Sequence, residues 1–276
     1  MPRLEETAVD STPTLLLYGG SGTAKTKFIG TAGSDSVIIT PAQGIATLQS
    51  KWFRENFKYN PIIEIVDEMP LPTIAQGYDK ITDLVEKYLL DKEINTIIVD
   101  DATNFRRLAL NKGLELNQSL NRSGTLAKMR TIKADTVIRE LNDMTMEMSL
   151  VESFIKQACT YCKEAKKTFV MTAHERLLFN PPAKVGAEDT IRKITPGFTG
   201  KTFPDDITGY FDLIWHTEVM GGGGQTHYQI LTQGDSKLVA KTRWAGLFPV
   251  RFEKQPLLAE VIQCVKTQTP IAGFKG

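Results

Sequence analysis

A glycine-rich segment near the start of the chain separates a short apolar run from a stretch with helical character. Residues 14–18 have the composition of a buried strand, and residues 25–29 can begin a helix. The segment between them is Gly19-Gly20-Ser21-Gly22-Thr23-Ala24-Lys25-Thr26. It follows the P-loop pattern GxxxxGK(S/T) at every fixed position except the second glycine, where Ala24 stands. A strand, a P-loop and a helix in this order predict an α/β fold that binds phosphate groups.

The residue types of this segment explain how it would hold a nucleotide. Backbone N–H groups of the loop and of the following helix N-terminus surround the phosphates. Lys25 reaches the β and γ oxygens, and the Thr26 hydroxyl ligates Mg²⁺. We therefore predict ATP and Mg²⁺ as cofactors, bound by all the residues from Gly19 to Thr26. The methyl group of Ala24 is tolerable there only if the residue keeps a negative φ and does not crowd the phosphate.

Further apolar runs lie at residues 37–40, 62–66, 96–99 and 169–172. They are rich in Ile and Val and hardly alternate with polar residues, as expected for strands buried on both faces of a parallel sheet. Helical patterns lie between them, notably over residues 74–90, and residues 126–167 predict a long helix. This β/α alternation indicates a doubly wound sheet with ligands at the carboxyl ends of its strands.

The C-terminal part of the chain predicts antiparallel strands. Residues 210–219 and 226–231 are apolar runs joined by the glycine tract 221–224, which is typical of a hairpin. A further strand is expected at 238–241 and a last helix at 256–266. The predicted fold class is therefore α/β, with a mostly parallel central sheet flanked by helices and with antiparallel C-terminal strands.

We predict a polar N-terminal arm over residues 1–13 and a single P-loop domain over residues 14–276. Within the domain, prolines, glycines and charges at about 175–206 predict a long, partly mobile loop. The 33 basic and 32 acidic residues give a net charge of +1, so the molecule as a whole does not attract nucleic acid or membranes. The arm lacks a signal-peptide core, and no stretch has the roughly 18 apolar residues of a membrane span. We expect a cytoplasmic protein with no membrane partner.

The second chemical signal is an acidic pair at the end of the run 96–99. In P-loop enzymes an aspartate at this place holds the Mg²⁺ shell, and Asp100 is the candidate. Asp101 has two interpretations of equal weight: it caps the helix that begins near Thr103, or it orients the attacking water.

Six motifs occur in an order that resembles a known family. They are YGGSGTAKT, IITPAQG, IIVDDAT, VMTAHE, PGFTGKTFPDDITGYFDLIWH and LVAKTR. Together they resemble the phage nucleotide-binding ATPases with a RecA-like core, including Sak-type single-strand annealing proteins, from about residue 14 to residue 243. The resemblance implies a RecA-like domain that binds ATP with Mg²⁺, forms a homo-oligomeric ring or filament, and works on single-stranded DNA in phage recombination or replication. For a phage protein the location would be the host cytoplasm, and a single-strand binding protein or replication protein is a further candidate partner.

The resemblance also assigns roles around the nucleotide. Lys25 and Thr26 match the phosphate and metal positions, and Asp100 matches the metal-associated acid. Such families often carry a glutamate that activates water before a glycine that follows the second strand, where this chain has Gln43. A neutral amide can orient water but cannot accept its proton. Hydrolysis is therefore expected to be weak or to rely on Asp101.

Two other places in the family pattern match polar residues of this chain. The γ-phosphate sensor corresponds to Thr172 or His174, although a lone His is more often packed or exposed without a role. Lys241 and Arg243 resemble the basic pair that reaches the nucleotide of the neighbouring subunit and stabilises charge on the transferred phosphate. The alternative for this pair is an ordinary solvated strand face.

Single-stranded DNA has two candidate sites. The expected loop combines cations for phosphates with aromatic rings for unstacked bases, although acids dilute its charge and an ordinary solvated loop is an equal interpretation. Its residues are Arg176, Lys184, Arg192, Lys193 and Lys201, with Phe179, Phe198 and Phe203. The second basic set is Arg106, Arg107, Lys112, Arg122, Lys128, Arg130 and Lys133.

Cys159 and Cys162 form a CxxC within a predicted helix, and no second pair completes a zinc site. Two buried thiols one turn apart are the simpler interpretation.

Two functions remain from the sequence. The first is an ATP-binding RecA-like protein that acts on single-stranded DNA, with the nucleotide controlling assembly and DNA binding. The second is a P-loop switch or loader that acts on a protein partner and hydrolyses ATP weakly. Ala24 and Gln43 favour weak turnover in both cases.

Overall fold

The structure is a computed structural model that describes residues 12–57, 59–67, 75–120, 131–133, 136–137, 141–180, 190–200, 203–222 and 225–273. The N-terminal arm up to residue 11 and Ile74 therefore lie outside the described residues. No helix among those that the structure describes is long and apolar enough to cross a membrane.

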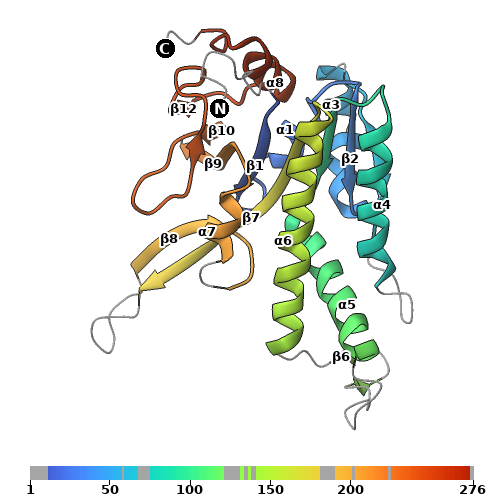
Figure 1. Ribbon diagram of the computed structural model, residues 1–276. Helices are drawn as coiled ribbons and strands as arrows, with labels where there is room; N and C mark the ends of the chain where they lie inside the picture. The colour runs from blue at the N-terminus through green and yellow to red at the C-terminus, as the bar shows by residue number, and fades with distance from the viewer. Residues whose placement is uncertain are drawn as a thin grey trace, which may run out of the picture.

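One large sheet organises the molecule (Figure 1). Its strands follow the order β12-β10-β9-β1-β7-β4-β2-β3. They are β1 (Thr14–Gly19), β2 (Ser36–Thr40), β3 (Ile62–Ile65), β4 (Thr96–Val99), β7 (Thr168–Asn180), β9 (Leu213–Gly222), β10 (Gln225–Leu231) and β12 (Arg251–Phe252). Off this path, β8 (Thr190–Pro196) pairs with β7, and β11 (Lys241–Thr242) pairs with β9.

The strand directions confirm the predicted fold class. From β9 through β1, β7, β4 and β2 to β3 all neighbours are parallel. The pairs β9–β10, β10–β12, β9–β11 and β7–β8 are antiparallel. The carboxyl ends of β1, β7, β4 and β2 therefore meet at one edge of the sheet, where the P-loop leaves β1.

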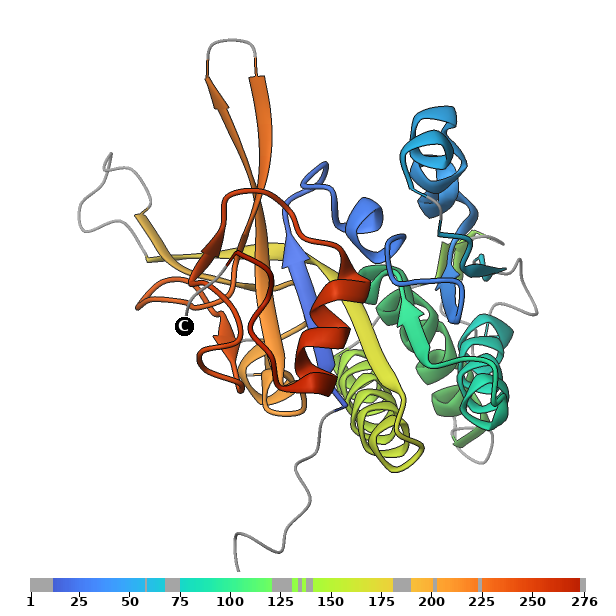
Figure 2. The same ribbon diagram turned by 90° about the horizontal axis from the view of Figure 1, so that it is seen from above.

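Helices cover both faces of the sheet (Figures 1 and 2). They are α1 (Lys25–Ile29), α2 (Ala46–Gln49), α3 (Lys51–Asn56), α4 (Gln76–Leu90), α5 (Ala102–Leu120), α6 (Leu141–Glu164), α7 (Phe203–Thr208) and α8 (Leu258–Thr267), with the 3₁₀ turn η2 (Ala42–Ile45) before α2. Alternate residues of β1 enter two different cores: Leu16 packs under α6, and Leu15 packs under α1 and α8. Because both faces are buried, the strand sequences show no alternation of polar and apolar residues.

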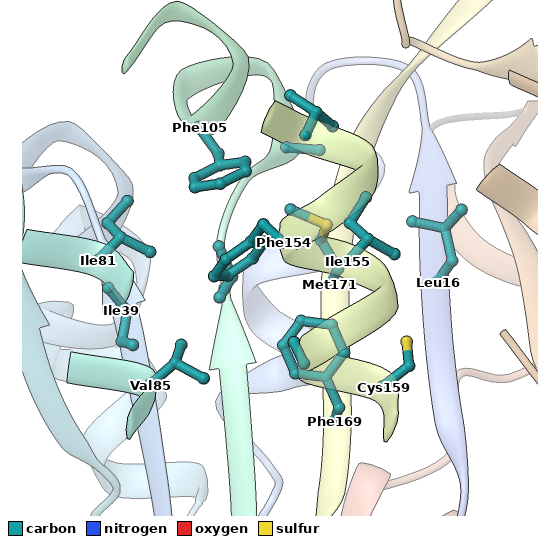
Figure 3. Packing of buried hydrophobic residues seen from close by; sticks show 14 of the residues in the cluster. Leu16, Ile39, Ile81, Val85, Phe105, Phe154, Ile155, Cys159, Phe169 and Met171 are labelled. Atoms are coloured by element: carbon teal, nitrogen blue, oxygen red, sulfur yellow. The ribbon is translucent and has the colours of Figure 1, made fainter. Parts of the chain in front are cut away.

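The core beneath α4, α5 and α6 is built from aromatic and branched side chains (Figure 3). Phe105 of α5 lies against Phe154 of α6, with ring centroids 4.2 Å apart. Cys159 and Cys162 are buried free thiols in this core, as the simpler interpretation predicted. Burial raises the pKa of both thiols, that of Cys162 to about 12, which keeps them protonated and unreactive.

Two local predictions were wrong. Residues 126–167 do not form one helix: β5 (Thr131–Lys133) pairs with β6 (Thr136–Val137), and α6 begins only at Leu141. β-Branched residues dominate this short pair and favour strand over helix.

The expected loop at about 175–206 is largely a hairpin. β7 continues to Asn180 and pairs with β8, so that Phe179 lies opposite Ile191. The residues that suggested a loop include Pro181, Pro182 and Gly186, which lie outside the described residues. In place of the strand predicted at 238–241, the structure has only the short β11, Lys241–Thr242.

Candidate functional site

The P-loop is anchored to the strand beside it. A Cβ on Gly19 would collide with the backbone and side chain of Thr217 on β9, so only glycine fits where the loop begins. The Thr23 hydroxyl donates to the Gly20 carbonyl at 2.8 Å and lies 2.6 Å from the Thr217 hydroxyl. The loop is thus held in shape by its own backbone and by β9.

Lys25 is buried inside this loop. Its Nζ donates to the carbonyl oxygens of Gly19 at 2.9 Å and of Gly20 at 2.7 Å. Desolvation lowers the pKa of its ammonium group, while Asp100 and other nearby acids act in the opposite direction. The predicted phosphate-binding lysine is therefore at the centre of the P-loop.

Thr26 in the first turn of α1, Asp100 directly after β4 and Thr172 within β7 lie in contact with one another through Asp100. The Thr26 hydroxyl donates to Asp100 Oδ2 at 3.1 Å, and the Thr172 hydroxyl donates to Asp100 Oδ1. Asp100 is only 6% exposed, and desolvation raises the pKa of its carboxyl, although these two hydroxyls lower it. The buried carboxylate of Asp100 and the hydroxyl of Thr26 together form a set of oxygen ligands that suits Mg²⁺. The residues predicted to hold the metal, Thr26 and Asp100, are in direct contact.

Asp101, joined to Asp100 by a cis peptide bond, has two partners. Its Oδ1 accepts from the backbone N–H of Asn104 at 2.8 Å, which confirms the helix-capping interpretation. Its Oδ2 lies 3.1 Å from His174 Nε2. His174 lies beside the start of the P-loop, because it pairs with Gly19 across the β1–β7 ladder. Thr172 and His174, the two sensor candidates, thus contact one acid of the pair each.

Ala24 does not meet the condition expected of it. Its φ is 63° and its ψ is 25°, in the left-handed region that favours glycine. The second glycine of the P-loop pattern would adopt this conformation without steric cost. The condition of a negative φ is therefore not met, and alanine at this position places local strain at the N-terminus of α1.

Gln43 lies in η2 with its side chain exposed. The next residue, Gly44, is the one that approaches the acid: a Cβ built on it would lie 3.6 Å from Asp100 Oδ2. A water-orienting role for Gln43 stays a prediction.

Lys241 and Arg243 lie at the opposite edge of the sheet from their own P-loop. Lys241 pairs with Ile214 near the start of β9, and its Nζ donates to the Thr208 carbonyl at 2.7 Å. Arg243 Nη1 lies 2.9 Å from Asp212 Oδ1. Through Ile214, Lys241 is level with Leu16, so three residue steps, about 10 Å, separate it from Gly19 along β1. Both side chains bind groups at this edge, Thr208 and Asp212, rather than the P-loop, and the role of the pair toward a neighbouring subunit stays a prediction.

Sequence reasoning missed Glu175 and His216. Glu175 Oε2 lies 2.8 Å from Nε2 of His216, which β9 places beside β1. Glu175 Oε1 would lie 3.4 Å from a Cβ on Gly20, so this carboxylate faces the P-loop. The only sequence signal was an acid after the strand of residues 169–172; the contact with His216 depends on the pairing of distant strands.

A pocket of about 830 Å³ lies beside α1. Lys27 of α1 stands over the Trp52 ring at 4.6 Å from its centroid, with Phe57 and Tyr228 close to the same ammonium. Gln255 on its wall donates to the Ala24 carbonyl at 3.3 Å, which connects the pocket to the P-loop. An aromatic pocket next to a phosphate site has the composition of a binding site for a planar ring.

The basic sets proposed for DNA are mostly engaged within the protein. Phe198 and Phe203 are buried in the core, so their predicted stacking role was wrong. Arg176 donates to the carbonyls of Phe198 and Gly200, and Lys193 pairs with Asp205. Phe179 and Arg192 are exposed on the β7–β8 hairpin, while Lys184 and Lys201 lie outside the described residues.

The second basic set is also occupied where its side chains are described. Arg106 binds the buried carboxylate of Glu147 at 2.7 Å, and Lys112 pairs with Asp79 and Glu115, each at 2.8 Å. Arg107 also has an interaction within the protein. The side chains of Arg122, Lys128, Arg130 and Lys133 lie outside the described part of the chain.

The sequence matches no protein-family model and no curated protein. Among solved structures, the chain is similar to the KaiC-like protein PH0186 from the hyperthermophilic archaeon Pyrococcus horikoshii OT3. The sequence identity is 11%, the TM-score is 0.38, and the similarity covers 79% of this chain and 77% of that chain. A likeness of this extent carries no argument about function, which has to come from the chain's own residues.

Proposed function

We propose that this protein binds ATP with Mg²⁺ at the P-loop and acts on single-stranded DNA, with the nucleotide controlling its assembly and its hold on DNA. This is the function of the RecA-like phage annealing ATPases that the sequence resembles. The observation that carries the nucleotide part is the convergence of Lys25, Thr26 and Asp100 at the end of β1.

Each of these residues has a role toward the triphosphate. Lys25, which now binds two loop carbonyls, would exchange them for phosphate oxygens. Thr26 and Asp100 would hold the Mg²⁺, which supplies positive charge to the phosphate oxygens when bound. The loop N–H groups and the N-terminus of α1 complete the anion site.

The pocket beside α1 supports a nucleoside rather than a bare phosphate ligand. Trp52, Phe57 and Tyr228 line the pocket, and a base could stack on the Trp52 ring if it displaced the Lys27 ammonium; Gln255 offers a polar group. We therefore place the base of ATP in this pocket.

The β7–β8 hairpin is the surface that supports a DNA partner. It continues the same strand that carries Thr172 and His174, and it projects beyond the helices (Figures 1 and 2). It exposes Phe179, of which 48% is accessible, and Arg192. An exposed ring and a cation are the elements of a sequence-tolerant single-strand site. A continuous strand from the nucleotide to this surface offers a path by which ATP could alter DNA binding.

The test measures anisotropy of a labelled single-stranded oligonucleotide titrated with the protein, with and without ATP and Mg²⁺. We expect ATP to strengthen binding and Lys25→Ala to remove that effect. Phe179→Ser should weaken DNA binding by about 1–3 kcal/mol, the typical contribution of one base–aromatic stack. Leu90→Ser, at a residue 85% exposed on α4, is the matched control.

Nucleotide binding is measured separately with a fluorescent ATP analogue. Folded protein that binds the analogue but no DNA under any condition would contradict the DNA part alone. Folded wild-type protein that does not bind the ATP analogue would contradict the whole proposal.

A protein partner is the second candidate, and one observation favours it. The hairpins expose several apolar side chains, namely Leu177, Phe179, Ile191, Val219 and Met220. Exposed apolar groups of this kind often mark protein interfaces. A change in oligomeric state with ATP, without DNA binding, would favour this P-loop switch or loader over the annealing protein.

A further inference from the structure

Glu175 differs from the other acids near Lys25 in how its oxygens are used. Asp100 accepts from two threonine hydroxyls, and Asp101 caps α5 and contacts His174. Glu175 uses Oε2 for His216, while Oε1 makes no hydrogen bond within the described residues and faces Gly20 of the P-loop. The negative charges of all three carboxylates raise the pKa of Lys25, against the lowering by desolvation. Glu175 is therefore the acid with an oxygen free to bind a water beside the phosphate loop.

His216 fixes the direction of this carboxylate. It lies on β9 between β1 and β10, its side chain is 6% exposed, and its ring lies tilted against that of Tyr18 with centroids 4.9 Å apart. A carboxylate can only accept hydrogen bonds, so Nε2 carries the proton that it donates to Glu175. Nδ1 is buried and has no partner among the described residues, and a proton there would be an unsatisfied buried donor. His216 thus orients Glu175 through Nε2.

The position of Glu175 also fits the geometry that hydrolysis needs. It follows His174, which pairs with Gly19 in the β1–β7 ladder, so it stands just beyond the first residues of the P-loop. Gly20 is half-buried, Ser21 is exposed and the Glu175 side chain is 29% exposed, so solvent reaches this side of the loop. Gln43, by contrast, is an exposed amide and cannot accept a proton.

From this geometry, and on the basis of the proposed ATP binding, we infer that Glu175 is the general base for ATP hydrolysis and that His216 is its positioning residue. Glu175 Oε1 accepts a proton from a water molecule as the water oxygen bonds to the γ-phosphorus. The bond between the γ-phosphorus and the β–γ bridging oxygen breaks, and its electron pair leaves with ADP. The products are ADP and inorganic phosphate, and the proton on Glu175 returns to solvent.

The experiment compares Glu175→Gln with the wild type in two measurements. Single-turnover hydrolysis of ATP should fall by about 100-fold or more, the usual contribution of a general base. Equilibrium binding is measured in parallel with a non-hydrolysable ATP analogue and with ADP. Removal of a negative charge beside the γ-phosphate should raise the affinity for the ATP analogue more than that for ADP. The amide oxygen introduced by Glu175→Gln can still accept from His216, so the fold should be retained.

His216 is tested by two variants that differ in donor capacity. His216→Leu removes the donor and should lower kcat with little change in KM, because Glu175 is then misoriented. His216→Gln retains an N–H donor and should recover much of the rate. Equal loss in both variants, with unchanged thermal unfolding, would assign His216 a packing role and remove it from the inference.

Controls separate this inference from the proposed function. Glu93→Gln changes an exposed acid at the far edge of the sheet and should hydrolyse ATP like the wild type. Gln43→Ala should lose less activity than Glu175→Gln. Wild-type rates in Glu175→Gln, or a wild type that binds ATP without hydrolysing it in the presence or absence of DNA, would overturn the assignment of Glu175 while leaving nucleotide binding intact. A wild type that binds no nucleotide would overturn both.

Discussion

Asp100 and Asp212 are buried acids at opposite edges of the same sheet, and their partners differ. Asp212 is 1% exposed and is surrounded by cations: Lys163 Nζ lies 2.9 Å from Oδ2, and Arg243 Nη1 lies 2.9 Å from Oδ1. It also accepts from the backbone N–H and the hydroxyl of Thr14. Asp100 is 6% exposed, and its hydrogen-bond donors are two neutral hydroxyls.

The difference indicates what each acid is for. A buried charge needs a compensating charge, and Asp212 finds its own within the chain, where it joins the start of β1 to α6 and to the segment after β11. Asp100 carries a desolvation cost that its two hydroxyl partners and the nearby Lys25 ammonium offset only in part, so the pKa of its carboxyl is raised. The first acid is structural, and the second has the electrostatics of a cation site that function completes.

The largest expected effect is that of Asp212→Ala on stability. The substitution removes the buried acid that Lys163 and Arg243 bind and the acceptor for Thr14, so the free energy of unfolding should fall by about 3–5 kcal/mol. Urea denaturation with an unchanged m-value is the measurement. Asp212→Asn retains an acceptor and should cost less; equal costs would show that the retained acceptor contributes nothing and that the charge accounts for the whole effect.

Asp100→Asn should have the opposite effect: little or no loss of stability, but a loss of Mg²⁺-dependent ATP binding. Without nucleotide the variant should be as stable as the wild type or more stable, because the amide avoids the desolvation of a buried charge. Its ATP affinity should lose the dependence on Mg²⁺, a loss of about 1.4 kcal/mol or more if that dependence is at least tenfold. Calorimetric titration with ATP in Mg²⁺ or in EDTA measures this. If Asp100→Asn is destabilised as strongly as Asp212→Ala, the functional interpretation of Asp100 fails.

The same comparison explains which parts of the molecule the sequence could predict. Lys25, Thr26 and Asp100 belong to short motifs beside strands, and parallel strands bring their carboxyl ends together; their meeting followed from local patterns. Asp212 and Glu175 depend on partners from strands far away in the chain, such as Thr14 and His216, which no local pattern identifies.

The predictions for the β7–β8 hairpin and for the β5–β6 pair were wrong for a related reason: the pairing of two strands is not contained in the pattern of either one. Prolines and charges at 181–189 suggested a loop, while the alternation that pairs Phe179 with Ile191 was too short to outweigh them. The burial of Phe198 depends on α7 and on the core beneath α6, which composition alone does not show. Cation–aromatic clusters in a sequence therefore need tertiary information before they can be assigned to DNA.

Ala24→Gly tests the strain at the functional edge. A glycine adopts the observed φ of 63° without the steric cost of a Cβ, so the variant should gain roughly 1 kcal/mol of stability. The gain should appear in urea unfolding and in tighter binding of the ATP analogue, because the loop carbonyls and N–H groups would keep their geometry. Ala32→Gly, at a buried residue just after α1 in the core under α8, should instead be destabilising. A loss of stability in Ala24→Gly would show that Ala24 carries no strain.

Arg243→Gln should have the smallest effect on stability and the most informative effect on function. The arginine is 57% exposed, so its ion pair with Asp212 should contribute less than about 1 kcal/mol, whereas Lys163→Met, at 25% exposure, should cost more. If Arg243 also reaches the nucleotide of a neighbouring subunit, Arg243→Gln will lose ATP turnover in the assembled protein while each chain still binds ATP. Unchanged turnover at protein concentrations that favour assembly would restrict Arg243 to the structural edge of the sheet, beside Asp212. In that case the edge of the sheet at Asp212 would serve stability alone, and the edge at Asp100 would carry the function.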